Sequence, residues 1–190
     1  MLKMTLKSLH KGKLPKAILI FFCTYVVFLV LWIQIKDPYC KGVIFTSSKL
    51  VAGLKGLKLE EITKEMDSFV ATFSPMNRNS ELLIETPVNI SSFTFNAPLT
   101  AAIMAALSLF IKKKGRAWGE ALLILFAVHL LYVFSLQAKE LTEVLIDLGF
   151  QSMSTPRVVF YQFLWGFTDN MIIRFEPFLI GLYMFLRFRV

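Results

Sequence analysis

The segment Ala17–Ile35, AILIFFCTYVVFLVLWIQI, contains 19 residues and no charge. At 1.5 Å of rise per residue, a helix of this length crosses the roughly 30 Å hydrocarbon core of a bilayer. Five lysines between Lys3 and Lys16 precede it, so a secretory signal is the alternative. The run is longer than a usual signal core, and the residues after it, KDP, contain no small-residue cleavage site. The segment therefore predicts an uncleaved membrane anchor.

Three further apolar runs predict three more membrane spans, over residues 96–111, 117–136 and 171–190. The first of these has small residues at helical spacing, which allow close helix contact in lipid. The start of the last is open, because the aromatic stretch 158–167 can extend it through a kink near Asp169 and Asn170.

Two polar segments separate the spans, residues 36–95 and 137–170. Apolar residues recur every three to five positions from Leu50 to Phe73, a pattern typical of an amphipathic helix. Alternation between residues 82 and 95, interrupted by Pro87, predicts one or two short strands. The second segment predicts a short helix that ends at Gly149.

The basic residues predict the orientation of the chain. Eleven of the 21 lie in the tail 1–16, the loop 112–116 and the carboxyl end, with Glu120 as the one nearby acid. By the positive-inside rule, these three segments are cytoplasmic. The net charge of +8 is therefore a topology signal rather than a nucleic-acid surface. We expect an all-α integral membrane protein of the bacterial inner membrane, with four transmembrane helices, both termini cytoplasmic and a small external α+β subdomain at 36–95.

Two residues outside the basic segments are candidates for chemistry. His129 falls near the middle of the third span, where an ionisable group must face a partner or a cavity. An interhelical hydrogen bond, to Ser108, Thr24 or Tyr132, is the structural alternative. Cys40 follows the first span and is a free thiol, half of an intermolecular disulfide or an incidental residue.

The fourth span carries the other candidates, Arg174 and Glu176, which lie directly before Pro177. Together with Asp169 and Arg157, they are able to form a charged cluster near the outer surface, with either a structural or a catalytic role. Nucleotide-binding, zinc-protease, hydrolase and CxxC motifs are lacking, so we expect no cofactor and no metal.

Three short motifs resemble those of the exosortase H-associated membrane proteins: Asn96-Ala97-Pro98-Leu99, Leu148-Gly149-Phe150-Gln151 and Glu176-Pro177-Phe178-Leu179. In this family the gene lies beside that of an exosortase, a membrane enzyme resembling cysteine transpeptidases that recognises carboxyl-terminal sorting tails in bacterial envelopes. Exosortases have more spans and use a Cys, an Arg and a His near the outer face. The resemblance therefore implies an accessory subunit rather than the enzyme.

These observations leave three hypotheses for function. The first is a non-enzymatic accessory or scaffold protein in exosortase-linked envelope protein sorting, whose partners are the bilayer and another membrane protein, an exosortase or an envelope complex, and not nucleic acid. The second is a small thiol-dependent enzyme that uses Cys40 with Arg157 or Arg174. The third is a transporter or channel subunit in which His129 and Glu176 line a polar path.

Overall fold

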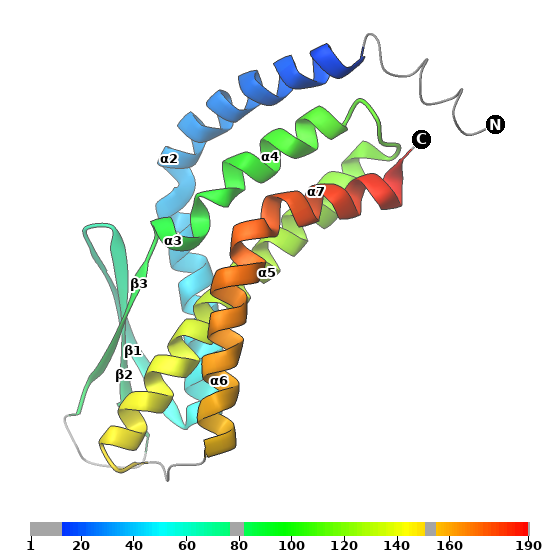
Figure 1. Cartoon of the computed structure of the whole chain (residues 1–190). Coiled ribbons are helices and arrows are strands. Elements are labelled where there is room, and N and C mark those ends of the chain that lie inside the picture. The colour runs from blue at the N-terminus through cyan, green and yellow to red at the C-terminus, as the bar shows by residue number, and fades with distance from the viewer. Residues whose placement is uncertain (1–12, 77–81, 151–154, 190) are drawn as a thin grey trace. The chain divides into compact units, whose positions relative to one another are not determined.

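The computed structural model describes residues 13–76, 82–150 and 155–189, which are mostly helical with one small sheet (Figure 1). The elements in chain order are α2 (Lys13–Lys55), β1 (Leu57–Glu65), β2 (Ser68–Pro75), β3 (Ile84–Asn89), α3 (Ser91–Thr94), α4 (Asn96–Leu107), α5 (Lys114–Asp147), α6 (Thr155–Phe167), the π-helix η1 (Thr168–Ile173) and α7 (Arg174–Phe188).

The chain divides into two compact units, each containing segments that are distant in sequence. The helical unit comprises the described parts of residues 1–35, 95–125 and 175–190. The sheet unit comprises those of 36–94 and 126–174. Helices α2 and α5 each contribute their first part to the helical unit and their second part to the sheet unit.

Two helices among the described residues, α2 and α5, are long and apolar enough to cross a membrane. The apolar stretch Ser91–Leu107, which contains α3 and α4, is shorter. The last expected span, 171–190, contains the end of η1 and the whole of α7, and α6 precedes it. Two of the four expected spans thus have the length and composition of a membrane helix, and the four-span arrangement stays a prediction.

The helix expected between Leu50 and Phe73 is wrong, because α2 ends at Lys55 and a β-hairpin follows. A β-bulge between Leu59 and Glu61 adds one residue to β1, so the apolar residues of that strand are spaced as they are on a helix. Met66, one of the apolar residues in the expected helical pattern, lies in the hairpin turn with φ of 49° and is 94% exposed.

Helix α2 also continues past Pro38, where the sequence suggested a change to a polar external segment. Beyond this proline its buried positions recur at intervals of three and four residues, the spacing of one helix face. The buried positions are Cys40, Val43, Ile44, Ser47, Ser48, Val51 and Ala52. Leu50 and Leu54, which anchored the expected helix, are exposed on the other side of α2.

The predicted strand near residues 82–95 is confirmed as β3, which pairs antiparallel with β2 at one edge of the sheet. Pro87 lies within this strand rather than interrupting it. An edge strand tolerates proline because one side of its backbone has no neighbouring strand to bond. Phe93, expected in extended structure, lies in the short helix α3 instead.

The predicted stop at Gly149 is confirmed, although the helix that it ends is the whole of α5 rather than a separate short helix. Gly149 has φ of +72°, and its N–H donates to the Ile146 carbonyl at 2.9 Å. The Phe150 N–H donates to the Leu145 carbonyl at 2.8 Å. This pair of bonds is a Schellman motif, which satisfies the last carbonyls of the helix.

The irregularity expected near Asp169 and Asn170 is confirmed as the π-helix η1. Its last residue is Ile173, whose carbonyl lies four residues before Pro177 and cannot receive a bond from that proline. The wide turn thus comes directly before the position where the helix loses a hydrogen bond.

Candidate functional site

A line of polar contacts joins α2 and α5 within the sheet unit. The Tyr39 hydroxyl and His129 Nδ1 are 2.8 Å apart, and Ser48 Oγ donates to Gln137 Oε1 at 3.1 Å. Lys55 Nζ donates to the Thr142 hydroxyl at 2.5 Å. Residue numbers rise together on both helices along this line, so the two helices run parallel in this unit.

The line continues to the sheet, because Gln137 Nε2 donates to the Thr86 hydroxyl of β3 at 3.3 Å. Ser48, Thr86 and Gln137 are all buried, and each has a partner among the other two. Satisfied polar groups of this kind fix which residues face each other, because a shifted register would leave buried groups unpaired. The contacts therefore set the alignment of α2, α5 and the sheet.

His129 is fully buried in this arrangement. Its ring meets Phe93 and Tyr39 edge-on, with centroids 5.4 and 5.7 Å away. The structural alternative of an interhelical hydrogen bond is what the geometry shows, and the partner at Nδ1 is Tyr39 rather than the residues named from the sequence. Tyr39 was missed because hydrophobic spacing does not show which residue of α2 faces α5.

Cys40 lies beside Tyr39 and is also fully buried, in an apolar cluster with Val43, Phe69 and Tyr132. Burial and the neighbouring Asp37 raise the pKa of its thiol to about 12. A nucleophilic cysteine needs the thiolate and access to its substrate. The environment of Cys40 opposes both, which argues against thiol chemistry at this residue.

Glu176 contributes a buried carboxylate to the helical unit, with 1% of its surface exposed. Asn96 Nδ2 donates a hydrogen bond of 3.2 Å to Glu176 Oε2. These residues begin the NAPL and EPFL motifs, so the two motifs meet although 80 positions separate them. The first residue of α4 is thereby joined to the first turn of α7, and Asn96 is a site residue that sequence spacing alone did not indicate.

Arg157 and Arg174 are exposed, at opposite ends of the helical stretch that α6 and η1 form. At 1.5 Å per residue, roughly 25 Å of helix separates them. Neither arginine, nor Asp169, takes part in the ion pairs found among the described residues. The structure therefore does not gather the two arginines into the charged cluster that the sequence suggested.

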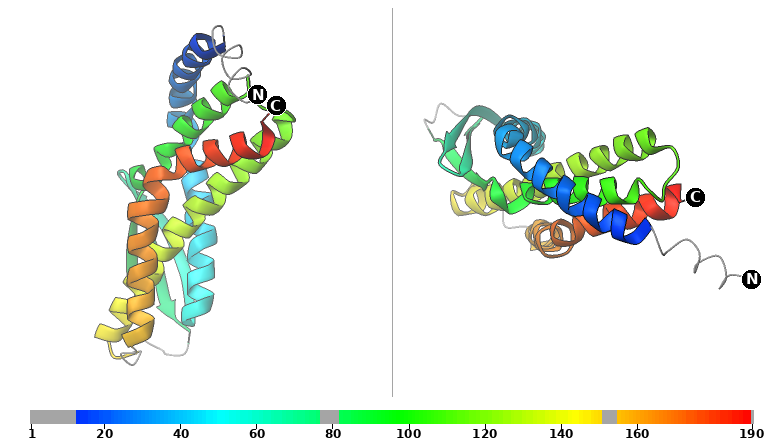
Figure 2. Two further views of the ribbon diagram at one scale, coloured as in Figure 1. Left: turned by 45° about the vertical axis from the view of Figure 1, so that its right-hand side comes forward. Right: turned by 90° about the horizontal axis from the view of Figure 1, so that it is seen from above.

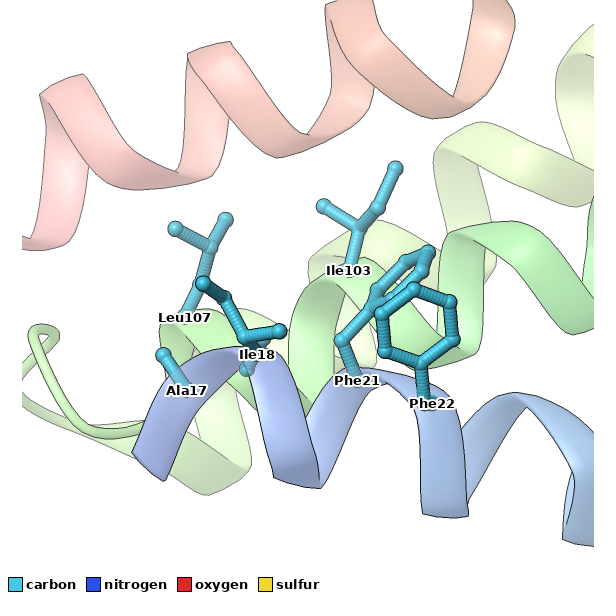
Figure 3. A pocket seen from close by; sticks show the side chains of 7 residues that line it. Ala17, Ile18, Phe21, Phe22, Ile103 and Leu107 are labelled. Atoms are coloured by element: carbon cyan, nitrogen blue, oxygen red, sulfur yellow. The ribbon is translucent and has the colours of Figure 1, made fainter. Parts of the chain in front are cut away.

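Two apolar cavities lie along the boundary between α2 and α4 in the helical unit, and we call them together the α2–α4 groove. One cavity, of about 260 Å³, is shown in Figure 3, where Phe21 and Phe22 of α2 lie near Ile103 of α4. The other has a volume of about 360 Å³ and includes part of α5 in its wall. Its lining residues are Phe28, Leu31, Trp32, Ile35, Ala97, Pro98, Ala101, Trp118, Leu122 and Leu125.

The lining of the groove is suited to apolar contact. Its walls are apolar, and three alanines, Ala17, Ala97 and Ala101, leave space at its floor. Small residues let another helix approach closely in lipid. Groups of three or more His, Cys, Asp or Glu side chains able to hold a metal ion are absent from the part of the chain that the structure describes.

The fold and the groove define a helical protein with two helices suited to a membrane and an apolar surface in one of its units. A family model described as exosortase H-associated membrane protein matches residues 12–188, and the chain belongs to this family. The resemblance drawn from the three motifs is thus confirmed. No curated protein and no solved structure matches the chain.

Proposed function

We propose that the protein is a non-enzymatic accessory or scaffold protein of the bacterial inner membrane that acts in exosortase-linked envelope protein sorting. Its α2–α4 groove binds a transmembrane helix of the exosortase. The observation that carries the proposal is a groove with apolar walls and an alanine floor, in a member of a family described by its association with an exosortase.

The groove suits an apolar helix better than a polar substrate. Leu31 on the wall is 47% exposed. Other large apolar residues on the same part of α2 are exposed as well. In lipid, exposure of apolar residues is not itself costly, and helices associate through close packing at small residues. The alanines are buried, so an incoming helix contacts the large apolar residues of the walls.

A four-span topology is part of the proposal, with the spans lying within residues 17–35, 96–111, 117–136 and 171–190. Because His129 lies beside Tyr39, which follows the first span, the third span ends before His129. The parallel alignment of α2 and α5 supports this topology, because both helices begin at basic segments assigned to the cytoplasm. The bond from Lys112 N–H to the Phe188 carbonyl, 2.7 Å, supports it as well. The basic loop and the carboxyl end of α7 meet at this bond, as the proposal requires of two cytoplasmic segments.

The remaining parts of the proposal concern the two polar segments, 36–95 and 137–170, which lie in the periplasm. Their described residues belong almost entirely to the sheet unit, which has its own packed clusters and buried hydrogen bonds. Cys40 and His129 serve its packing, and Glu176 joins α4 to α7, so in this proposal all three are structural rather than catalytic.

The test is co-expression with the exosortase of the same genome, followed by co-purification in mild detergent. Replacing Ala101→Leu fills the floor of the larger cavity, and overpacking costs about 1–3 kcal/mol, so recovery of the exosortase should fall at least about fivefold. The matched control is Ala127→Leu, since Ala127 is an exposed alanine of α5 outside the groove.

The variant Leu31→Trp tests the groove independently, in case Ala101→Leu misfolds. Leu31 is half exposed, so its replacement alters only the α2 wall of the same cavity. Unchanged recovery with both groove variants contradicts docking in the groove. Equal loss with the Ala127 control shows a general effect of added bulk, and it contradicts the proposed site as well.

A further inference from the structure

Five basic side chains surround one pocket at the end of the helical unit. The pocket has a volume of about 260 Å³ and is lined by the connection from α4 to α5 and by the end of α7. These two segments lie side by side in Figures 1 and 2. The lining residues of the pocket are Lys112, Lys113, Arg116, Arg187, Phe188 and Arg189. The cations thus come from two segments that are more than 70 positions apart in sequence.

Backbone contacts hold these two segments together. The Lys112 N–H donates to the Phe188 carbonyl at 2.7 Å, and Ile111 and Arg189 form an antiparallel bridge. The positive-inside rule requires basic residues on this side of the membrane, but it does not require two basic segments to join around a common pocket. The backbone contacts therefore point to a role beyond orientation.

The cations of the pocket are only partly neutralised by the protein. Glu120 pairs with Arg116 at 2.9 Å and with Arg187 at 3.3 Å. Lys112, Lys113 and Arg189 take no part in the ion pairs between described residues. Like charges held this close repel one another, and a bound anion relieves that repulsion. The first turn of α5 begins at Lys114 and adds the positive end of its helix dipole.

The position of the pocket along the chain indicates which class of anion it binds. Each basic segment directly follows an apolar helical segment, α4 on one side and α7 on the other. If these helices lie in the bilayer, the pocket is at the level of the lipid phosphates. Basic pockets between membrane helices on this side are suited to anionic lipid headgroups.

We propose that this pocket binds the phosphate headgroup of an anionic phospholipid in the cytoplasmic leaflet. Lys112, Lys113 and Arg189, all exposed, contact the phosphate oxygens. The bound lipid fastens the end of α7 to the loop before α5. The proposal does not depend on exosortase binding, but the assignment to a lipid and the choice of leaflet both rest on the proposed topology.

The test uses the purified full-length protein in a neutral detergent, titrated with phosphatidylglycerol and, separately, with phosphatidylcholine. Native mass spectrometry measures the bound fraction. The variant Lys112→Gln with Arg189→Gln removes two cations and leaves both Glu120 pairs intact. Each basic residue near an anionic surface contributes roughly fivefold to binding, so affinity for phosphatidylglycerol should fall roughly 30-fold.

The matched control is Lys13→Gln with Lys16→Gln, which removes two exposed cations from the same predicted side but outside the pocket. The proposal expects this control to bind phosphatidylglycerol like the wild type. Equal losses in both double variants show a diffuse surface charge and overturn the proposal. Absence of preference for phosphatidylglycerol over phosphatidylcholine also overturns it.

A further arm separates a lipid from a soluble anion. Glycerol 3-phosphate carries the same phosphate chemistry without acyl chains, and it should displace phosphatidylglycerol only at far higher concentration. If glycerol 3-phosphate alone binds as tightly as the lipid, the pocket holds a soluble anion, and the assignment to lipid is contradicted.

Discussion

The two units of this protein meet the problem of burial in different ways. In the sheet unit, polar groups such as Ser48 and Gln137 are buried and hydrogen-bonded to each other, inside clusters of apolar side chains. In the helical unit, α2 and α4 leave apolar cavities between them, and large apolar residues such as Leu19 and Leu123 face outward. Buried hydrogen bonds of the first kind are typical of a core that forms in water, and the apolar surface of the second suits lipid or another helix.

The contrast indicates where stability and where binding reside. A water-exposed domain gains most of its stability from removing apolar surface from water, so its core residues carry large energies. Helices in lipid gain little from such burial and depend on close packing. The helical unit is accordingly where small residues should matter most, and the variants below compare the two units.

The largest effect is expected from Leu141→Ala, because Leu141 is fully buried in the sheet unit against α2 and the sheet. The cavity should lower the free energy of unfolding by about 2–5 kcal/mol. Leu123→Ala makes the same change on the same helix in the helical unit, where the side chain is 71% exposed. It should cost less than about 0.5 kcal/mol in detergent unfolding. Similar losses at both positions remove the distinction between the units.

Gln137→Leu should have the next largest effect on the free energy of unfolding, since it leaves Ser48 and Thr86 without their buried partner. The expected loss in unfolding free energy is about 1–3 kcal/mol. The double variant with Ser48→Ala removes both partners, and a double-mutant cycle measures the coupling between them. A coupling energy near zero shows that the polar line does not set the alignment of α2 and α5.

Gly181→Ala tests close packing in the helical unit, where α7 approaches α4 (Figure 2). A Cβ at Gly181 would lie 2.6 Å from the Ile103 side chain, and Ile103 is branched and stiff. We expect a loss of about 1–2 kcal/mol, relieved by a second change, Ile103→Ala. Gly166→Ala on α6 is the control, because no atom lies within 4 Å of its added Cβ. An effect at Gly166 as large as that at Gly181 contradicts the close approach.

The last comparison concerns Glu140, on α5 in the sheet unit. Burial, with a smaller contribution from Glu143, raises the pKa of its carboxyl from 4.5 to about 7. Between these values the folded chain binds a proton that the unfolded chain has lost, so unfolding free energy falls as pH rises from about 4.5 to about 7. Glu140→Gln should therefore stabilise the protein at pH 8 and change little at pH 4. Parallel stability curves for variant and wild type contradict this assignment.

Sequence patterns located the helical segments better than they located the strands. A charge-free run such as Ala17–Ile35 indicates a helix by its length and apolar character, and Gly149 marked a helix end because it adopts a left-handed conformation. The hairpin was missed because a bulge beside Glu61 makes strand spacing resemble helix spacing. Extra residues in a strand are set by pairing with its neighbour, and pairing is not a local property.

Of the buried polar residues in the candidate site, the sequence indicated His129 and Glu176 but not what they contact. His129 and Glu176 stand out because ionisable residues are rare in apolar runs. Their partners Tyr39 and Asn96 are 90 and 80 positions away, and no periodicity links them. Asn96 had one available signal, since it opens a motif shared in form with Glu176: a polar residue followed closely by proline.

The central claim is that the α2–α4 groove binds the exosortase, and site-specific photocross-linking tests it most directly. A photoreactive amino acid is placed at Leu31 in the groove, and in a separate variant at Leu123, which is more exposed but lies outside it. Each variant is co-expressed with the exosortase of the same genome and irradiated in intact cells. If the exosortase binds in the groove, the variant with the photoreactive residue at position Leu31 forms a covalent product with it, and the variant at Leu123 forms little. Cross-linking from Leu123 and none from Leu31 would contradict this claim.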